Sequence, residues 1–112
     1  IRPWCRAASN DAACARTATG GDSGSIDVAE IYAPFTHQQL ILAEAIGLGP
    51  STKINPSGGA LAANPMFSTG LERIGFAARH IFTRSAQRVL AHATSGPVLQ
   101  QNLVAVLEGK DA

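Results

Sequence analysis

Charge and aromatic side chains are both scarce in this sequence. Charged residues make up 15% of its 112 residues and aromatic residues 5%, and the formal net charge is +1. This balance gives no electrostatic reason to expect binding to nucleic acid or to an anionic membrane surface. Long apolar runs are also missing, because none approaches the ~20 residues that a membrane-spanning helix needs. We therefore expect neither a nucleic-acid partner nor a membrane span.

Cysteine and metal-ligand patterns are equally sparse. The two cysteines, Cys5 and Cys14, lie in a segment without regular apolar spacing, so we expect no disulfide framework. The first residues lack the apolar core of a secretory signal peptide, and a reducing, cytoplasmic location is the better expectation. The three histidines, His37, His80 and His92, have no i, i+4 or similar spacing. The sequence therefore predicts no metal site.

The composition that is present predicts one globular domain, preceded by a different kind of segment. Hydrophobic residues make up 46% of the chain, which is typical of a folded protein. Residues 1–24 combine Ala, Ser, Thr, Gly, Asp and Arg without a helical or alternating apolar pattern. We expect residues 1–24 to be an unstructured or unrelated leader without function, and residues 25–112 to form the domain.

Within the domain, strands alternate with helices. A short β-branched run at residues 26–31 predicts a buried strand, and Lys53–Asn55 is a candidate for another. Strands are also expected at residues 87–93 and 103–107, with a turn at Ser95-Gly96-Pro97 between them. One helix is expected to begin at Pro34 and to end at Gly47 or Gly49. This order favours an α/β fold, with a mixed sheet, covering helices and a C-terminal antiparallel strand pair.

A second helix is expected to begin at Ser68 or Thr69. Thr69 and Glu72 have the spacing of a capping box, in which each side chain bonds a backbone N–H at the helix start. The next apolar residues fall on one helical face, and the charged Arg73 lies off it, where we expect it to be solvated. The residues of the apolar face are Leu71, Ile74, Ala78 and Ile81.

The loop at residues 55–70 is the most informative stretch of the chain. Gly58-Gly59 permits positive φ and a close approach of backbone to a ligand. Asn55-Pro56 and Asn64-Pro65 each force extended or turn geometry on the asparagine. A helix follows the loop at once, so free backbone N–H groups could hold a carbonyl or an anion there. An ordinary surface connection is the alternative.

Two segments of the chain resemble the thiolase superfamily. Asn55-Pro56-Ser57-Gly58-Gly59, followed by Pro65 and Gly70, resembles the C-terminal signature of its sterol-carrier and lipid-transfer-protein branch, which reads Asn-Pro-Ser-Gly-Gly, Gly-His-Pro and Gly-Ala-Thr-Gly. Residues 26–35, with Asp27 and Glu30, resemble the family's Asp-x-x-Glu segment and the Asn-Glu-Ala-Phe or His-Asp-Cys-Phe motif that ends it. The resemblance covers residues 26–108 and implies an incomplete thiolase-like C-terminal half-domain.

The resemblance also implies a site that lacks its nucleophile. The family's acylated cysteine belongs to the other half-domain, and Cys5 and Cys14 have no matching context. A second family cysteine would fall at Thr94, in Thr94-Ser95-Gly96, or within Tyr32-Ala33-Pro34-Phe35 at Pro34, and neither residue is a thiol. The family's Gly-His-Pro histidine corresponds to Asn64, which can donate an oxyanion hydrogen bond but cannot take a proton from a thiol.

Other residues complete the expected site. Tyr32 stands where the family has an active-site polar residue, and it is either an acid/base group or an amphipathic strand-end tyrosine. The resemblance implies contacts with a coenzyme A thioester for Ser57, Gly58, Gly59 and Pro65, and more weakly for His92. No cofactor is implied other than this thioester substrate.

Hypotheses of different classes follow. The chain is either the C-terminal part of a thiolase-like acyl-CoA acyltransferase of lipid or steroid metabolism, or a non-catalytic subunit that binds acyl-CoA or lipid or serves as a scaffold. A retro-aldolase subunit of the same fold and an inactive remnant are further alternatives. Because sheet edges and helix faces would stay open, we expect a separate N-terminal half or a second copy as partner.

Overall fold

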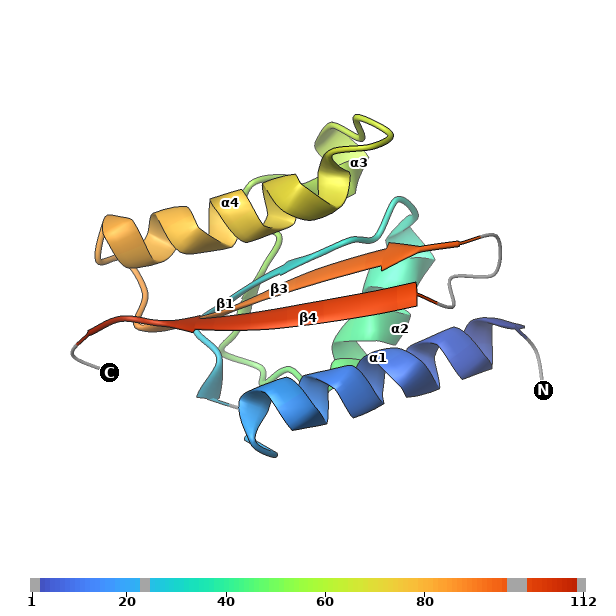
Figure 1. Cartoon of the computed structure of the whole chain (residues 1–112), viewed down its shortest axis with the longest axis horizontal. Helices are drawn as coiled ribbons and strands as arrows, with labels where there is room; N and C mark the ends of the chain where they lie inside the picture. The colour runs from blue at the N-terminus through green and yellow to red at the C-terminus, as the bar shows by residue number, and fades with distance from the viewer. Residues whose placement is uncertain (1–2, 23–24, 97–100, 111–112) are drawn as a thin grey trace.

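The computed structural model is an open mixed sheet with helices on both faces (Figure 1). It describes the backbone of residues 3–22, 25–96 and 101–110, and the side chains of those ranges from residue 11 onward. The strands lie in the order β2-β1-β3-β4, with β1 parallel to β2 and β3, and with β3 antiparallel to β4. The elements in chain order are α1 (Pro3–Thr19), β1 (Val28–Ile31), α2 (Thr36–Ile46), β2 (Lys53–Ile54), α3 (Gly59–Ala62), α4 (Thr69–Phe82), β3 (Arg88–Ser95) and β4 (Gln101–Glu108).

This arrangement confirms the predicted fold class in its coarse form. The α/β order, the mixed sheet and the final antiparallel pair are all present. Candidate strand Lys53–Asn55 forms the two-residue edge strand β2. Gly47 ends α2 in the left-handed conformation as expected, whereas α2 begins at Thr36 rather than at Pro34. Of the expected turn after β3, Pro97 lies outside the described residues.

Two apolar clusters hold the layers together. On one face of the sheet, α1 and α2 pack through Ala15, Leu42 and Ile46 against β1 and β3. On the other face, α4 packs through Ala77 against Val28, Val89 and Ala91. Side chains alternate between the faces along a strand, so β1 and β3 both contribute to both clusters. All four residues of β1 are buried.

The expectation of an unstructured leader at residues 1–24 is wrong for most of that segment. Pro3–Thr19 forms the 17-residue helix α1, which packs against α2 and β4 in Figure 1. Its buried stripe consists of small and polar side chains, not of large apolar ones. Alanine favours helix strongly, but a stripe without Leu, Ile or Val gives no apolar period to recognise. Within residues 11–19, the part of α1 whose side chains are described, the buried residues are Asp11, Ala12, Ala15 and Thr19.

The buried face of α4 also differs from the expectation. Thr69, Arg73 and Ala77 are buried, whereas Leu71 is 72% exposed. The expected capping box does not form, because the N-cap is Ser68 and its side chain bonds no backbone N–H. Arg73, expected in solvent, faces the sheet because Glu30 of β1 offers it a buried carboxylate at 3.1 Å. A charge pair thus overrides the apolar period in setting the rotation of this helix.

The chain order creates a switch point at the centre of the sheet. From β1 the chain passes through α2 to β2 on one side, and then through α4 to β3 on the other side of β1. The helices of these two connections cover opposite faces. In such sheets the loops diverge at the carboxyl ends of the two central strands and leave a crevice there.

Candidate functional site

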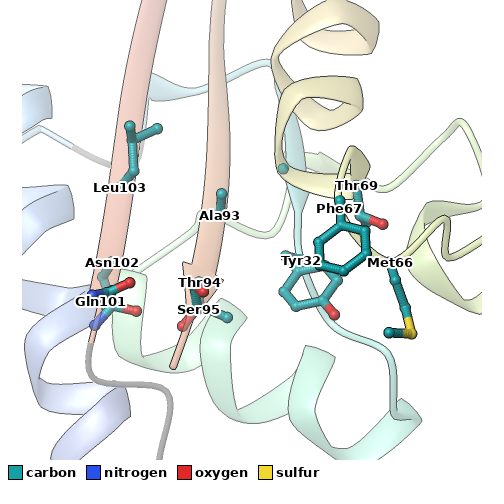
Figure 2. Close-up of a pocket in the computed structure, with 11 residues that line it drawn as sticks. Tyr32, Met66, Phe67, Thr69, Ala93, Thr94, Ser95, Gln101, Asn102 and Leu103 are labelled. Carbon is teal, nitrogen blue, oxygen red and sulfur yellow. The ribbon is translucent and has the colours of Figure 1, made fainter. Parts of the chain in front are cut away.

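A cavity of about 330 Å³ lies at the switch point. It opens where β1 and β3 end, where β4 begins and where α4 begins, and Figure 2 shows its side chains converging from these elements. Its wall mixes apolar surface with hydroxyl and amide groups. The lining residues are Tyr32, Met66, Phe67, Thr69, Gly70, residues 93–95 and residues 101–103.

Tyr32 reaches this cavity from the end of β1. In Figure 2 its ring lies between the end of β3 and the segment that carries Met66 and Thr69. Its backbone N–H donates to the carbonyl of His92 at 3.1 Å, which continues the parallel ladder for one residue past β1. The same N–H lies 3.3 Å from Nδ1 of His92. The strand end therefore fixes the backbone of Tyr32, and its half-buried side chain faces the cavity.

His92 lies behind the wall of the cavity rather than in it. The side chain is fully buried, and its Nε2 lies 2.9 Å from Oδ1 of Asp11 on α1. Nδ1 faces the N–H of Tyr32 and is placed to accept from it, and Nε2 is placed to donate to Asp11. Both ring nitrogens are thus engaged within the protein, and His92 acts on the site through Tyr32.

Asp11 joins a further lining residue to this network. In the amide orientation that satisfies its neighbours, Asn102 donates from its side-chain nitrogen to Oδ1 of Asp11 at 2.7 Å and to Oγ1 of Thr94 at 2.8 Å. Asn102 and Thr94 both line the cavity. One buried carboxylate therefore connects three parts of the cavity wall, namely the strand ends of β1 and β3 and the start of β4.

The first half of the loop at residues 55–70 is tied to the interior. Ser57 donates to the Glu30 carboxylate twice, from its hydroxyl to Oε2 at 2.7 Å and from its backbone N–H to Oε1 at 3.1 Å. Arg73 donates to the same Oε2 at 3.1 Å and to the Ser57 hydroxyl at 3.3 Å. Its guanidinium also lies 5.4 Å from the ring centroid of Phe76. Ser57 therefore helps to satisfy a buried ion pair.

The paired glycines are explained by contacts within the same loop. Gly58 and Gly59 both have positive φ, of 93° and 60°. A Cβ on Gly59 would lie 2.9 Å from the side chain of Asn55, whose Oδ1 accepts from the N–H of Ile31 at 2.7 Å. A Cβ on Gly58 would lie 2.7 Å from that of Ala62. The glycines thus let the loop close on itself beside β1, and neither of them lines the cavity at the switch point.

The second half of the loop borders the cavity. Asn64 is exposed and its Oδ1 lies 2.9 Å from Oγ1 of Thr69, while the carbonyl of Pro65 lies 2.6 Å from the same hydroxyl. Thr69 lines the cavity, whereas Asn64 and Pro65 do not. Of the expected site residues, Tyr32 lines the cavity, while Asn64, Pro65 and His92 stand one contact away from it. Ser57, Gly58 and Gly59 belong to the Glu30 cluster.

Three residues of these networks escaped the sequence reasoning. Arg73 lies in an amphipathic helix, and Glu30 lies in a segment expected to be a buried strand. A buried acid in the sequence could have suggested a basic partner such as Arg73. Asp11 is the only acidic residue of α1, and such an isolated acid in an alanine-rich segment is a weak signal. Asn102 gave none, since nothing in the sequence connects it with Asp11, which is 91 positions distant.

The described residues were also considered for a membrane-spanning helix and for a metal-ion site. No helix in the described part of the chain is both long and apolar enough to cross a membrane. Within the same residues, no group of three or more His, Cys, Asp and Glu side chains is placed to hold a metal ion. Cys14 is half-buried and borders a separate shallow hollow between α1 and β4, away from Tyr32.

Comparison with known proteins gives no further guide, since no family model, curated protein or solved structure matches this chain.

Proposed function

We propose that this chain supplies one half of a thiolase-like acyl-CoA site, in which the cavity at the switch point receives the thioester carbonyl. The nucleophilic sulfur comes from another polypeptide segment. The reaction class is acyl transfer in lipid or steroid metabolism. We place the protein in the cytoplasm, as its cysteine usage suggests.

The position of the cavity carries this proposal. Ligands of open α/β sheets bind outside the carboxyl ends of the strands at a switch point, and the cavity lies there. The two segments that resemble the thiolase superfamily also meet at this cavity, since Tyr32 belongs to the first and Thr69 and Gly70 to the second. Residues 37 and 38 positions apart in the sequence thus face a single space.

The lining favours a ligand that accepts hydrogen bonds. Tyr32, Thr94 and Ser95 bring hydroxyl groups to the wall. The Thr69 hydroxyl and the Asn102 amide nitrogen also lie at the wall, but they already donate to other protein atoms. A donor held on a strand end is pre-organised for a carbonyl oxygen, which develops negative charge when a thioester is attacked. In this proposal the Tyr32 hydroxyl donates to that oxygen. Asn64 acts indirectly, because its amide oxygen orients the Thr69 hydroxyl.

A binding experiment tests the proposal on the isolated chain. Tyr32 is the only tyrosine, so labelling with 3-fluorotyrosine gives one ¹⁹F resonance, which reports directly on the cavity. Titration with acetyl-CoA is expected to shift this resonance, and coenzyme A without the acyl group to shift it less. Tyr32→Phe, followed by calorimetry, is expected to weaken acetyl-CoA binding by about tenfold, the equivalent of one lost hydrogen bond of ~1.4 kcal/mol.

Ser51→Ala serves as the control, because it removes a hydroxyl at the opposite end of the sheet. Acetyl-CoA affinity is expected to stay unchanged in this variant. If acetyl-CoA leaves the Tyr32 resonance unmoved at millimolar concentration, or if Tyr32→Phe and Ser51→Ala weaken binding equally, the cavity is not an acyl site.

A retro-aldolase subunit of the same fold is the second candidate, favoured by the tyrosine in the cavity. A phenol can serve such a reaction as acid/base, whereas thiolysis requires a thiol that no described lining residue provides. Assays with a separately expressed N-terminal thiolase half distinguish the candidates. Thioester turnover that falls on Asn64→Ala supports the acyltransferase, and acyl-CoA binding without turnover in any combination supports a non-catalytic binding or scaffold subunit.

A further inference from the structure

The two edges of the sheet differ in how they are protected against pairing with another chain. Edge strand β2 has two residues, Lys53 and Ile54, and the chain leaves it through Asn55-Pro56. Short length, lysine and proline are the means by which natural sheets keep an edge from pairing. The β2 edge therefore has all three, and we expect it to stay unpaired.

Strand β4 forms the opposite edge and has none of these features. It has eight residues, without proline or lysine, and its only charged residue, Glu108, is bound by Arg88 of β3 at 2.9 Å. Figure 1 looks onto this edge, with α4 above β4 and α1 below it, and neither helix crosses in front of the strand. Among the described residues, β3 is the only strand paired with β4. Its outer backbone N–H and C=O groups thus face away from the sheet.

The sequence of β4 is complementary to itself. Residues 103–107 read Leu-Val-Ala-Val-Leu, the same in both directions about Ala105. An antiparallel pair of two such strands, related by a two-fold axis at Ala105, places Leu103 opposite Leu107, Val104 opposite Val106, and Ala105 opposite itself. In an isologous contact, residue i of one chain meets residue j of the other, and j meets i. In this register each such pair joins two side chains of the same type.

The side chains of β4 have apolar surface left to bury in such a pair. Leu103 is 48% exposed, and Val104, Ala105, Val106 and Leu107 are half-buried. Apolar and β-branched cross-strand neighbours each stabilise a pair of strands by roughly 0.2–1 kcal/mol relative to alanine. No like charges oppose each other within residues 103–107 in this register.

We propose that two copies of this chain pair through β4, antiparallel and about a two-fold axis at Ala105, to form one continuous eight-stranded sheet. We choose a second copy as the partner because this register matches apolar side chains of equal size along all five residues 103–107. This interface stands independently of the acyl site. It also brings Leu107 of the second copy beside Leu103, which lines the cavity at the switch point.

The mass of the full-length chain in solution tests the surface. Sedimentation equilibrium and light scattering are expected to give twice the chain mass of 11.6 kDa, with dissociation on dilution. Leu103→Lys places a charge opposite the apolar Leu107 at both symmetric positions, and we expect it to weaken the dimer by about tenfold or more. Leu40→Lys, at a 72% exposed leucine of α2, is the matched control and is expected to leave the dimer unchanged.

Thiol oxidation tests the register. In a background with Cys5→Ser and Cys14→Ser, Ala105→Cys puts the two new thiols directly opposite each other, with Cβ atoms about 4.5–5.5 Å apart. Val104→Cys puts its thiols on the diagonal, about 7–8 Å apart. We expect covalent dimers to form much faster with Ala105→Cys than with Val104→Cys.

Each contrary result overturns the proposal. If the mass is that of a single chain at all concentrations up to the millimolar range, the protein does not form the proposed dimer. If Leu103→Lys and Leu40→Lys weaken the dimer equally, β4 is not its interface. If Ala105→Cys and Val104→Cys form covalent dimers at equal rates, the two strands do not pair in the register centred on Ala105. Open-ended aggregates that grow with concentration, or a complex that forms only with an N-terminal thiolase half, show that β4 has another occupant. None of these outcomes depends on acyl-CoA binding, so they leave the proposed function to its own test.

Discussion

Two buried carboxylates, one on each face of the sheet, illustrate different ways of keeping a charge inside this small protein. Glu30 is fully buried and pairs with Arg73 of α4. Asp11 is 2% exposed and is bound by the side chains of His92 and Asn102. The first carboxylate has a guanidinium as its partner, whereas the second is bound by a histidine ring and an amide.

The two carboxylates differ because Arg73 and His92 have different second contacts. The Arg73 guanidinium is always charged, and its pair with Glu30 is completed by the Ser57 hydroxyl and backbone. The His92 ring faces the N–H of Tyr32 on its other side, and a proton on that nitrogen would set two donors against each other. The Glu30 cluster is therefore held by charge, and the Asp11 network is held by hydrogen bonds that depend on the neutral ring.

Removing the cation from the Glu30 cluster should have the largest effect. Arg73→Met leaves a fully buried carboxylate without its charge partner, and breaking a buried pair in this way costs about 3–5 kcal/mol. We expect the free energy of unfolding, measured in urea, to fall by this amount. The loss exceeds that of a lost hydrogen bond because the remaining charge stays in the interior.

Two further variants isolate the charge in that result. Arg79→Met changes an exposed arginine of the same helix, and we expect a change within about 0.5 kcal/mol. Adding Glu30→Gln to Arg73→Met removes the orphaned charge and is expected to recover part of the stability. If the double variant is less stable than Arg73→Met alone, the cluster is not held by its charge pair.

Breaking the Asp11 network should have a smaller effect on stability but a direct effect on Tyr32. Asp11→Ala deprives the His92 Nε2–H of its acceptor, and a lost hydrogen bond to a charged group costs about 1.5–3 kcal/mol. The ¹⁹F resonance of labelled Tyr32 should shift or broaden, because His92 contacts the Tyr32 backbone. Arg16→Ala, at an exposed residue of α1, should change neither quantity.

The histidine itself provides a second readout of this network. Long-range ¹H–¹⁵N spectra of the wild-type chain should show His92 with its proton on Nε2 and an unprotonated Nδ1. If the opposite tautomer is observed, or if the Tyr32 resonance does not move in Asp11→Ala, Asp11 does not act on Tyr32 through His92. The comparison of the two carboxylates would then reduce to stability alone.

The same comparison shows what the sequence could and could not predict. The strands and the helix end at Gly47 followed from β-branched runs and from glycine, because local preference and tertiary structure agree at these positions. The role of Arg73 could not be read from helical periodicity, since its partner Glu30 is 43 residues distant. Helix α1 was missed because its buried stripe holds alanine and Asp11, whose contact with His92 spans 81 residues.

Of the expected site residues, only Tyr32 lies in the wall of the cavity at the switch point, for the same physical reasons. Tyr32 was found because it directly follows a recognisable strand, and strand ends meet at one edge of a parallel sheet. The loop glycines, Gly58 and Gly59, were noticed because of their conformation. Their contacts with Ala62 and Asn55, however, depend on how the loop folds back on itself. Side-chain networks that join distant segments are thus the part that sequence reasoning cannot supply.

Two glycines provide a sharper test of the loop that supports the Glu30 cluster. Gly59 has a φ of 60° and no room for a Cβ beside Asn55. Gly59→Ala should therefore destabilise by about 1–2 kcal/mol, since left-handed backbone and crowding both oppose alanine. Gly75 lies within α4 with open space at the Cβ position. There Gly75→Ala should stabilise by roughly 0.5–1 kcal/mol. Equal signs in thermal unfolding would contradict this account of the loop.

A third carboxylate, on the surface, gives the smallest effect and completes the comparison. Asp27 is exposed, and the backbone N–H groups of Arg88 and Gln87 donate to it and hold its pKa below the ordinary value. Because the unfolded chain binds this proton more readily, Asp27 adds stability that is present above its unfolded pKa and is lost as the pH falls through its lowered folded pKa. Asp27→Asn should therefore slightly flatten the acid limb of a curve of stability against pH. Glu44→Gln, at an exposed acid of α2, is the control and should leave the limb as steep as in the wild-type chain. An unchanged limb in Asp27→Asn would show that the two backbone bonds do not favour the charged form.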